Sequence, residues 1–245
     1  MCRMLVVSGE FEMNEIVNHI CSMAKDELET IHEFHEKYEK GNFQHKEGWG
    51  VCYLKEGELV VEKSVLPLFN DPKIEQIRKI KTNFAMFHVR RATRGGAKKE
   101  NTHPFYVGKR KDAHVLCHNG TVIEEIEHAK DYRVKGETDS EKLLYSILTD
   151  LQDKKNDHVI TVKNNLKRYK KSRGCNVIFS NKDQTLVGIK KNINPNYYHM
   201  HLGIGKKFKI ISSEKLPMKE SVEWKILTGG KVAKINLHSN ELIII

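Results

Sequence analysis

Apolar and polar residues follow two different patterns along this chain. Residues 3–8 contain the continuous apolar run Met-Leu-Val-Val, which predicts a buried β-strand. From about Glu12 to Lys40, apolar residues recur every three to five positions with Glu and Lys between them, and this spacing predicts a helix that ends at Gly41. The pattern also predicts shorter helices over residues 72–80, 122–130, 140–151 and 157–171.

Strand-like runs make up most of the remaining sequence. Residues 51–54 and 59–62 flank a turn and predict a β-hairpin, whereas residues 84–90 and 114–117 predict interior strands. The C-terminal part predicts short strands at residues 176–180, 184–190, 198–203, 207–212, 223–227, 231–236 and 242–245. Strands at both ends with helices between them predict an α+β fold with largely antiparallel sheets. We expect one domain over residues 1–245, because no linker or repeat interrupts the pattern.

The composition is that of a polar chain of 245 residues with enough apolar content, 39%, for a sizeable core. No apolar run approaches the length of a transmembrane helix. The N-terminal apolar run is too short for a signal peptide, and acidic residues follow it at once. We therefore expect a cytoplasmic protein with no membrane partner. The five cysteines form no CxxC pair, which argues against a zinc site and a disulfide framework.

The charge balance allows a nucleic-acid partner but does not favour one. The chain has 42 Lys and Arg residues against 32 Asp and Glu, a formal net charge of +10. The basic residues are dispersed, and no nucleic-acid-binding motif accompanies them. A solvated basic surface is the better interpretation. Clustering of the basic runs 109–111 and 167–171 on one face would favour a binding surface instead.

Histidines in the first predicted helix raise the question of a metal site. His32 and His35 lie three positions apart, but no carboxylate motif of the HExxH type accompanies them. We therefore expect surface histidines on a helix, with no bound metal and no cofactor.

Cys2 occupies an unusual position directly after the initiator methionine. If Met1 is removed, Cys2 carries a thiol and a free α-amine, which is a nucleophile with its own candidate base. The alternative is that Cys2 is simply the second residue of a buried strand. The first seven residues alone favour this alternative, so the rest of the chain must decide.

Three later stretches contain residues that would complete a site around such a nucleophile. A predicted interior strand runs through Arg90 into a polar loop with Thr93, and an arginine fork suits a carboxylate. The next interior strand ends in Asn119-Gly120, which is either a hairpin turn or a pair of donors for an oxyanion. Asp139 stands at the start of a predicted helix, where an N-cap is the simpler interpretation.

In order and spacing, these stretches resemble the class II glutamine amidotransferases, the glutaminase members of the N-terminal-nucleophile hydrolases. The similarity is greatest to the stand-alone branch that lacks a fused synthase domain. The matching segments span nearly the whole chain: Met1-Cys2-Arg3, Glu47-Gly48-Trp49-Gly50, residues 88–95, Asn101-Thr102-His103-Pro104-Phe105, His118-Asn119-Gly120, residues 137–141 and Ser212-Ser213-Glu214. The resemblance implies a four-layer αββα sandwich of two largely antiparallel sheets between helices.

The resemblance also implies a role for each candidate residue. Cys2 would attack the side-chain amide carbon of glutamine, with its own α-amine as general base. The Asn119 side chain and the Gly120 backbone N–H would hold the oxyanion. Substrate contacts would come from Arg90 at the α-carboxylate, Thr93 beside it and Asp139 at the α-ammonium. Ammonia would leave, and water would hydrolyse the γ-glutamyl thioester without any cofactor.

Three departures and alternatives stay open at this point. The chain has Arg91 and Arg94 where synthase-fused members have Trp and His. No synthase domain follows, so a separate ammonia-accepting synthase subunit is one expected partner. A second alternative is hydrolysis of another γ-glutamyl amide, because Arg90 and Asp139 would recognise only the amino-acid end of the substrate. A third, of a different class, is a catalytically silent basic binding module.

Overall fold

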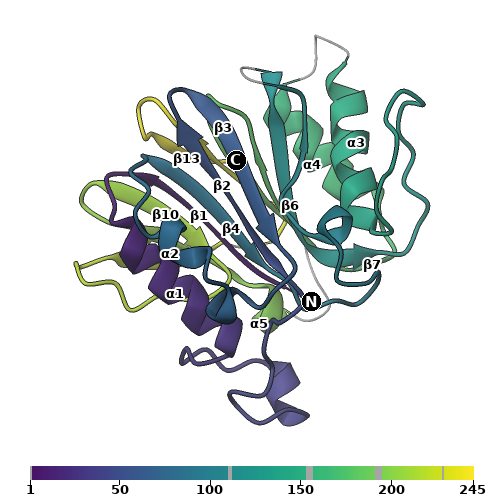
Figure 1. Cartoon of the computed structure of the whole chain (residues 1–245). Coiled ribbons are helices and arrows are strands. Elements are labelled where there is room, and N and C mark those ends of the chain that lie inside the picture. Colours follow the sequence, from purple (N-terminus) through teal and green to yellow (C-terminus); the bar gives the residue numbers. More distant parts are fainter. Residues whose placement is uncertain (1, 110–111, 153–156, 191–194, 228) are drawn as a thin grey trace.

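The computed structural model describes residues 2–109, 112–152, 157–190, 195–227 and 229–245. The strands in these ranges form two antiparallel sheets that pack face to face (Figure 1). In the described residues, the first sheet has the strand order β11-β9-β10-β1-β4-β2-β3. Its strands are β1 (Arg3–Gly9), β2 (Trp49–Lys55), β3 (Glu58–Ser64), β4 (Phe84–Val89), β9 (Met200–Ile204), β10 (Phe208–Ser212) and β11 (Glu223–Leu227).

The second sheet has the strand order β13-β12-β8-β7-β6-β5 over the same described ranges. Its strands are β5 (Phe105–Val107), β6 (His114–Val122), β7 (Ser172–Ser180), β8 (Gln184–Ile189), β12 (Val232–Asn236) and β13 (Leu242–Ile244). Strands β6 and β7 pair along most of their length, and their register shifts between Gly120 and Thr121. This irregularity lies at the end of β6 that carries the candidate oxyanion donors.

Helices cover the outer face of each sheet, as Figure 1 shows. Helices α1 (Met13–Lys25) and α2 (Ile74–Ile77) lie against the first sheet, and α3 (Asp139–Leu151) and α4 (His158–Arg168) lie against the second. Short helical turns occur in the connections: α5 (Pro195–Tyr198), η1 (Glu33–Glu36), η2 (Leu68–Asn70) and η3 (Lys99–Asn101). No helix in the described ranges has both the length and the apolar character needed to cross a bilayer.

The apolar run near the N-terminus forms β1, which lies in the interior of the first sheet. Leu5 and Val7 pack in the cluster under α1, whereas Met4 and Val6 pack in the cluster between the two sheets. Successive strand residues point to opposite faces, so a strand buried on both faces must be apolar throughout. The layer order is helix, sheet, sheet, helix, and it confirms the predicted α+β sandwich.

The predicted helix from Glu12 to Lys40 is wrong in its second half. Helix α1 ends at Lys25 because Asp26 adopts the left-handed conformation (φ 64°), and its N–H closes the last turn. Beyond it, Phe34 and Phe43 belong to a separate aromatic cluster. Leu28 and Ile31 continued the helical spacing of α1, but the chain after Lys25 folds into a loop.

Around residue 120, one of two open interpretations is excluded and one prediction is wrong. Strand β6 continues through Asn119 and Gly120 to Val122, so these residues do not form the hairpin turn that was the alternative to an oxyanion-donor pair. Residues 123–130, predicted as part of a short helix, form an irregular connection. Ile126 in this connection is buried under α3, so its apolar character reflects packing and not helical periodicity.

Candidate active site

Cys2 lies just before β1, partly exposed, and its backbone is fixed on both sides. The Cys2 backbone N–H donates to Asn119 Oδ1 at 3.0 Å, and the Cys2 carbonyl accepts from the Tyr197 hydroxyl at 3.0 Å. The thiol contacts the Arg91 carbonyl oxygen, with an Sγ–O distance of 3.8 Å. The α-nitrogen and the thiol are therefore held by residues far apart in sequence. Met1, whose removal the mechanism requires, lies outside the described residues.

A buried ion pair supports this end of β1 from behind. Arg3 Nε lies 3.0 Å from Glu214 Oε1, and the two side chains are 2% and 3% exposed. Arg3 Nη1 donates to the Tyr197 carbonyl at 3.0 Å, and the guanidinium lies over the Tyr197 ring. Ser213 Oγ accepts from the backbone N–H of Met4. Ser213 and Glu214, which follow β10, thus fix Arg3 and Met4, the two residues after Cys2.

Gly120 has a backbone that only glycine adopts without strain. Its φ is 153°, and a Cβ at this position would lie 2.5 Å from the Gly174 carbonyl oxygen. Asn119, next to it, is buried, and its Oδ1 is the acceptor for the Cys2 nitrogen. The sequence-predicted donor pair therefore lies beside Cys2, on the last part of β6.

One pocket brings most of the predicted residues together. The space between its lining residues, open solvent included, is about 350 Å³. Its lining consists of Cys2, residues 90–94, His103, His118, Gly120 and residues 138–140. Cys2, Arg90, Thr93, Gly120 and Asp139 all belong to this lining, and Asn119 contacts Cys2 directly. The sequence prediction of these residues as one site is therefore consistent with their positions.

The guanidinium of Arg90 is occupied by its own loop. Nη2 donates to the carbonyls of Arg94 and Gly95 at 2.6 and 3.0 Å. Nη1 donates to the carbonyls of Gly96 and Glu47 at 3.2 and 3.4 Å. In this conformation Arg90 organises the loop that follows β4.

Asp139 is the first residue of α3, not its N-cap. The N-cap is Thr138, whose side chain makes no capping hydrogen bond. Asp139 Oδ2 accepts from the Val122 backbone N–H at 2.6 Å and lies 4.0 Å from His118 Nδ1. Its other oxygen has no hydrogen-bond partner among the residues that the structure describes. One carboxylate oxygen at the pocket therefore stays available for a cationic group.

Three buried histidines lie at or behind the pocket, and the sequence analysis gave them no role. His103 and His118 line the pocket, and His88 contacts both of them. The rings of His88 and His103 stack with centroids 3.9 Å apart, and the His88 Nε2 interacts with the His118 carbonyl at 3.2 Å. Burial lowers the pKa of His88 to about 3 and also lowers the pKa of His103 and His118. At neutral pH these three imidazoles are therefore uncharged. The sequence did contain a signal for these histidines, because each lies within a segment that matches the family: residues 88–95, 101–105 and 118–120.

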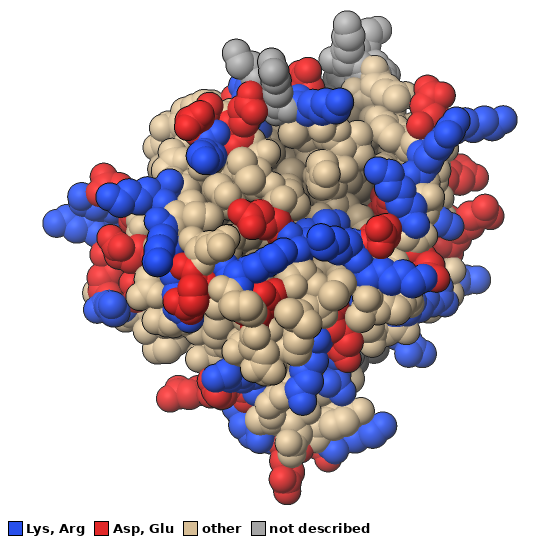
Figure 2. All heavy atoms as spheres, viewed as in Figure 1, with Lys and Arg blue, Asp and Glu red and all other residues tan. Residues whose placement is uncertain are grey.

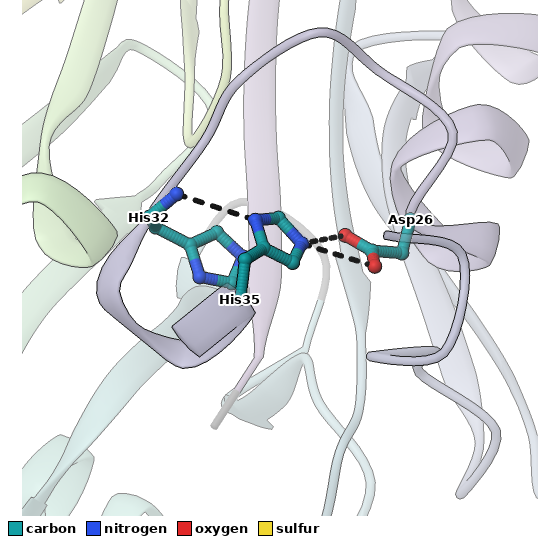
Figure 3. Close-up of side chains that lie close together, drawn as sticks. All are labelled: Asp26, His32 and His35. Atoms are coloured by element: carbon teal, nitrogen blue, oxygen red, sulfur yellow. Dashed lines mark hydrogen bonds and ion pairs between the residues drawn. The ribbon is translucent and has the colours of Figure 1, made fainter. Parts of the chain in front are cut away.

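Asp26, His32 and His35 form a cluster that could hold a metal ion by composition (Figure 3). His32 is buried, which corrects the expectation of surface histidines. The His35 Nε2 lies 3.0 Å from Asp26 Oδ1. The His35 Nδ1 accepts the backbone N–H of His32, and the His32 Nδ1 accepts the backbone N–H of Phe34. The Nδ1 of a ligating histidine usually donates, so ligation through Nε2 would break both bonds. These hydrogen bonds stabilise the folded loop after α1.

Charged side chains of both signs are interspersed over the face shown in Figure 2. Arg110 and Lys111, from one of the two basic runs, lie outside the described residues. On this face, the charge pattern of the described residues does not separate into a basic and an acidic region.

Comparisons with known proteins agree with this geometry. A family model described as class II glutamine amidotransferases matches residues 13–194. Uncharacterized protein MJ1515 of Methanocaldococcus jannaschii is 34% identical over 113 residues, which cover 44% of this chain and 31% of that protein. The protein of Escherichia coli named "Putative glutamine amidotransferase YafJ" is 37% identical over 106 residues, 42% of this chain and 41% of that protein. The matches thus span less than half of either relative.

Solved structures share the fold at low sequence identity. The glutamine phosphoribosylpyrophosphate amidotransferase from B. subtilis superposes with a TM-score of 0.73 at 16% identity, covering 100% of this chain and 49% of that chain. The glutamine aminotransferase class-II domain protein SPO2029 from Silicibacter pomeroyi gives a TM-score of 0.62 at 15% identity, covering 100% of this chain and 98% of that one. With the family match over most of its length, the chain belongs to the class II glutamine amidotransferase family.

Proposed function

We propose that the chain is a glutaminase-type amidohydrolase in which Cys2, freed of Met1, attacks the side-chain amide of glutamine. The observation that carries the proposal is the placement of the Cys2 nitrogen 3.0 Å from Asn119 Oδ1, in a pocket shared with Gly120 and Asp139. The family match begins at residue 13, so the role of Cys2 rests on this geometry and on the sequence resemblance.

The proposed reaction assigns one step to each group. The free α-amine of Cys2 takes the thiol proton, and the thiolate adds to the amide carbon. The Gly120 N–H and the Asn119 amide stabilise the oxyanion, and removing one such donor typically costs about 3–4 kcal/mol of barrier. The α-ammonium group of Cys2 then returns this proton to the leaving nitrogen, so that collapse of the intermediate expels ammonia and leaves a γ-glutamyl thioester on Cys2. Water then releases glutamate and regenerates the thiol.

We assign recognition of the α-ammonium and α-carboxylate groups of the substrate to Asp139 and Arg90. The unpartnered oxygen of Asp139 would accept the α-ammonium group. The α-carboxylate would replace the Arg94 and Gly95 carbonyls on Arg90 Nη2, with Thr93 beside it. A carboxylate accepts two parallel N–H groups from an arginine fork better than two separate carbonyls do. Substrate binding would therefore rearrange the loop that Arg90 now holds.

Turnover of glutamine by the processed protein tests this proposal. We expect purified protein without Met1, verified by intact mass, to release equal amounts of ammonia and glutamate from glutamine. Cys2→Ala should abolish this release. Cys21→Ala, which changes another partly exposed cysteine, should leave it unchanged. Lack of turnover by the processed protein would sink the glutaminase assignment.

A second candidate, hydrolysis of another γ-glutamyl amide, uses the same residues. It is favoured by the fact that Arg90 and Asp139 contact only the amino-acid end in the proposed pose. Cleavage of small γ-glutamyl amides without cleavage of glutamine would select it. Ammonia from glutamine would need a separate acceptor, and we propose a synthase subunit for that role. Salt-sensitive nucleic-acid binding with no hydrolysis of either substrate would instead support a silent binding module.

A further inference from the structure

We propose that Arg91 is a positioning residue that fastens the loop 91–96 to an aromatic platform and so sets the geometry around the Cys2 thiol. The aromatic platform consists of Tyr38, Phe43 and Tyr197. The expected effect of Arg91 on turnover rests on the proposed function, but its expected effect on the thiol does not.

Three contacts of the Arg91 side chain reach one short segment, residues 38–44. Its guanidinium carbon lies 4.3 Å from the ring centroid of Phe43 and 5.2 Å from that of Tyr38. Its Nη1 donates to the Gln44 carbonyl at 3.0 Å. A planar guanidinium can stack on a ring while its edge donates hydrogen bonds, which an ammonium group cannot do. These contacts tie the start of the loop to residues 38–44.

Two routes lead from Arg91 to the nucleophile. Through the main chain, the Arg91 carbonyl oxygen lies 3.8 Å from Cys2 Sγ. Through the side chain, Phe43 packs edge to face on Tyr197, with centroids 5.8 Å apart, and the Tyr197 hydroxyl donates to the Cys2 carbonyl. The loop 91–96 and Cys2 are therefore both held by contacts with the same aromatic platform. A shift of Arg91 would change the surroundings of the thiol.

Arg90 and Arg91 hold the loop at different points. Arg90 is buried and fixes residues 94–96 from inside, through their carbonyl groups. Arg91 fixes the beginning of the loop from the other side, on the aromatic platform. Thr93, which lines the pocket, lies between these two attachments. Loss of the Arg91 attachment should therefore loosen the pocket side of the loop without unfolding the sheet beneath it.

The Asp26, His32 and His35 cluster has a role in this scheme as the support of the aromatic platform. The His32 ring packs edge to face on Phe43 and Tyr197, with centroids 5.4 and 4.9 Å apart. Asp26 Oδ2 also accepts the backbone N–H of Phe43 at 3.2 Å. The folded loop after α1 thus holds the surface on which Arg91 stacks.

Alkylation of Cys2 by iodoacetamide tests the positioning role without any substrate. We expect Arg91→Ala to raise the alkylation rate of Cys2, followed by peptide mass spectrometry, by about threefold or more, because the loop that contacts the thiol opens more often. Arg91→Lys should not restore the wild-type rate, since it keeps the charge but loses the stacked fork. Cys21 on α1 is an internal control, and an unchanged Cys21 rate shows that the variant stays folded.

Steady-state kinetics and a double-mutant cycle complete the test. With glutamine, Arg91→Ala should lower kcat/KM by about tenfold, with most of the change in KM, because the loop carries substrate contacts. Phe43→Leu should give a similar loss, and the double variant should be no worse than the more affected single variant. Lys37→Ala removes the other cation over the Tyr38 ring and should behave as wild type.

Each outcome has a separate meaning. An unprocessed or inactive wild type would count against the proposed function, while the alkylation rates would still test Arg91. An active wild type with unchanged alkylation and kinetics in Arg91→Ala would overturn the positioning role. Independent, multiplying effects of Arg91→Ala and Phe43→Leu would also overturn it, because the two residues would then not act through one contact.

Discussion

At the residue scale, the pairing of Arg3 with Glu214 shows how the interior fixes the backbone next to Cys2. Arg3 follows Cys2 directly, and its guanidinium contacts both Glu214 and Tyr197 in nearly complete burial. Removing a charge from water costs several kcal/mol, which only a well-placed partner offsets. The pair therefore depends on both members, and the backbone next to Cys2 has little freedom to move.

We expect Glu214→Gln to destabilise the protein by about 3–5 kcal/mol, because it leaves the Arg3 charge buried without its counter-charge. Urea denaturation at pH 7 measures this change. Glu27→Gln is the matched control, since Glu27 pairs with Lys25 at the exposed surface and should give no resolvable change. A Glu214→Gln variant as stable as wild type would mean that the ion pair does not hold this end of β1.

At the element scale, the helices differ in how their N-termini are capped. Asp157 caps α4, and its Oδ1 accepts the backbone N–H groups of Val159 and Ile160 at 2.8 and 3.2 Å. Helix α1 begins after Glu12, whose side chain makes no capping bond. Thr138, before α3, also makes none, and there the Asp139 carboxylate instead serves the pocket and Val122. Of these three helices, only α4 has a side-chain N-cap.

Asp157→Ala should lower the free energy of unfolding by about 1 kcal/mol, because two N–H groups of the first turn of α4 lose their acceptor. Chemical denaturation followed by circular dichroism gives this value. Glu12→Ala should change stability much less, since no capping bond is lost. Equal effects of the two substitutions would contradict the capping argument.

At the scale of the whole molecule, the two-sheet core buries histidines that must stay neutral. His88 lies in β4 and is fully buried, with its pKa lowered to about 3 by burial. Burial also lowers the pKa of His45, His103 and His118. In the unfolded chain each would titrate near 6.5. Below that pH the unfolded state binds more protons than the folded state, so acid favours unfolding.

Stability should therefore fall as the pH decreases from about 6.5 to 5, before most carboxylates begin to titrate. His88 alone contributes roughly 1.5 kcal/mol to this fall, since its folded form stays neutral over the whole interval. The contribution is fully present above pH 6.5, so stability between pH 7 and 8 should change little on this account. Urea denaturation at half-unit intervals measures the slope. A flat profile from pH 7 to 5 would contradict neutral burial.

The sequence by itself determined those features that depend on local pattern and residue type. The run of apolar residues in β1 requires burial on both faces, and the helices α3 and α4 follow from their periodicity. The motifs around Cys2, Arg90, Asn119 and Asp139 were sufficient to predict the family. These residues lie at or beside one pocket, and their roles in a site stay a prediction. The inferences of fold and family held because each depends on local patterns and motifs that have few alternatives.

Only the tertiary structure decided where the chain bends and what each polar group contacts. Leu28 and Ile31 continue the apolar spacing of α1, but a left-handed Asp26 and its contact with His35 fold this segment into a loop. The fork of Arg90 is satisfied by carbonyls of its own loop, and a partner for Arg91 comes from residue 44. Such contacts join residues distant in sequence, so their free energies depend on the assembled packing and not on local pattern.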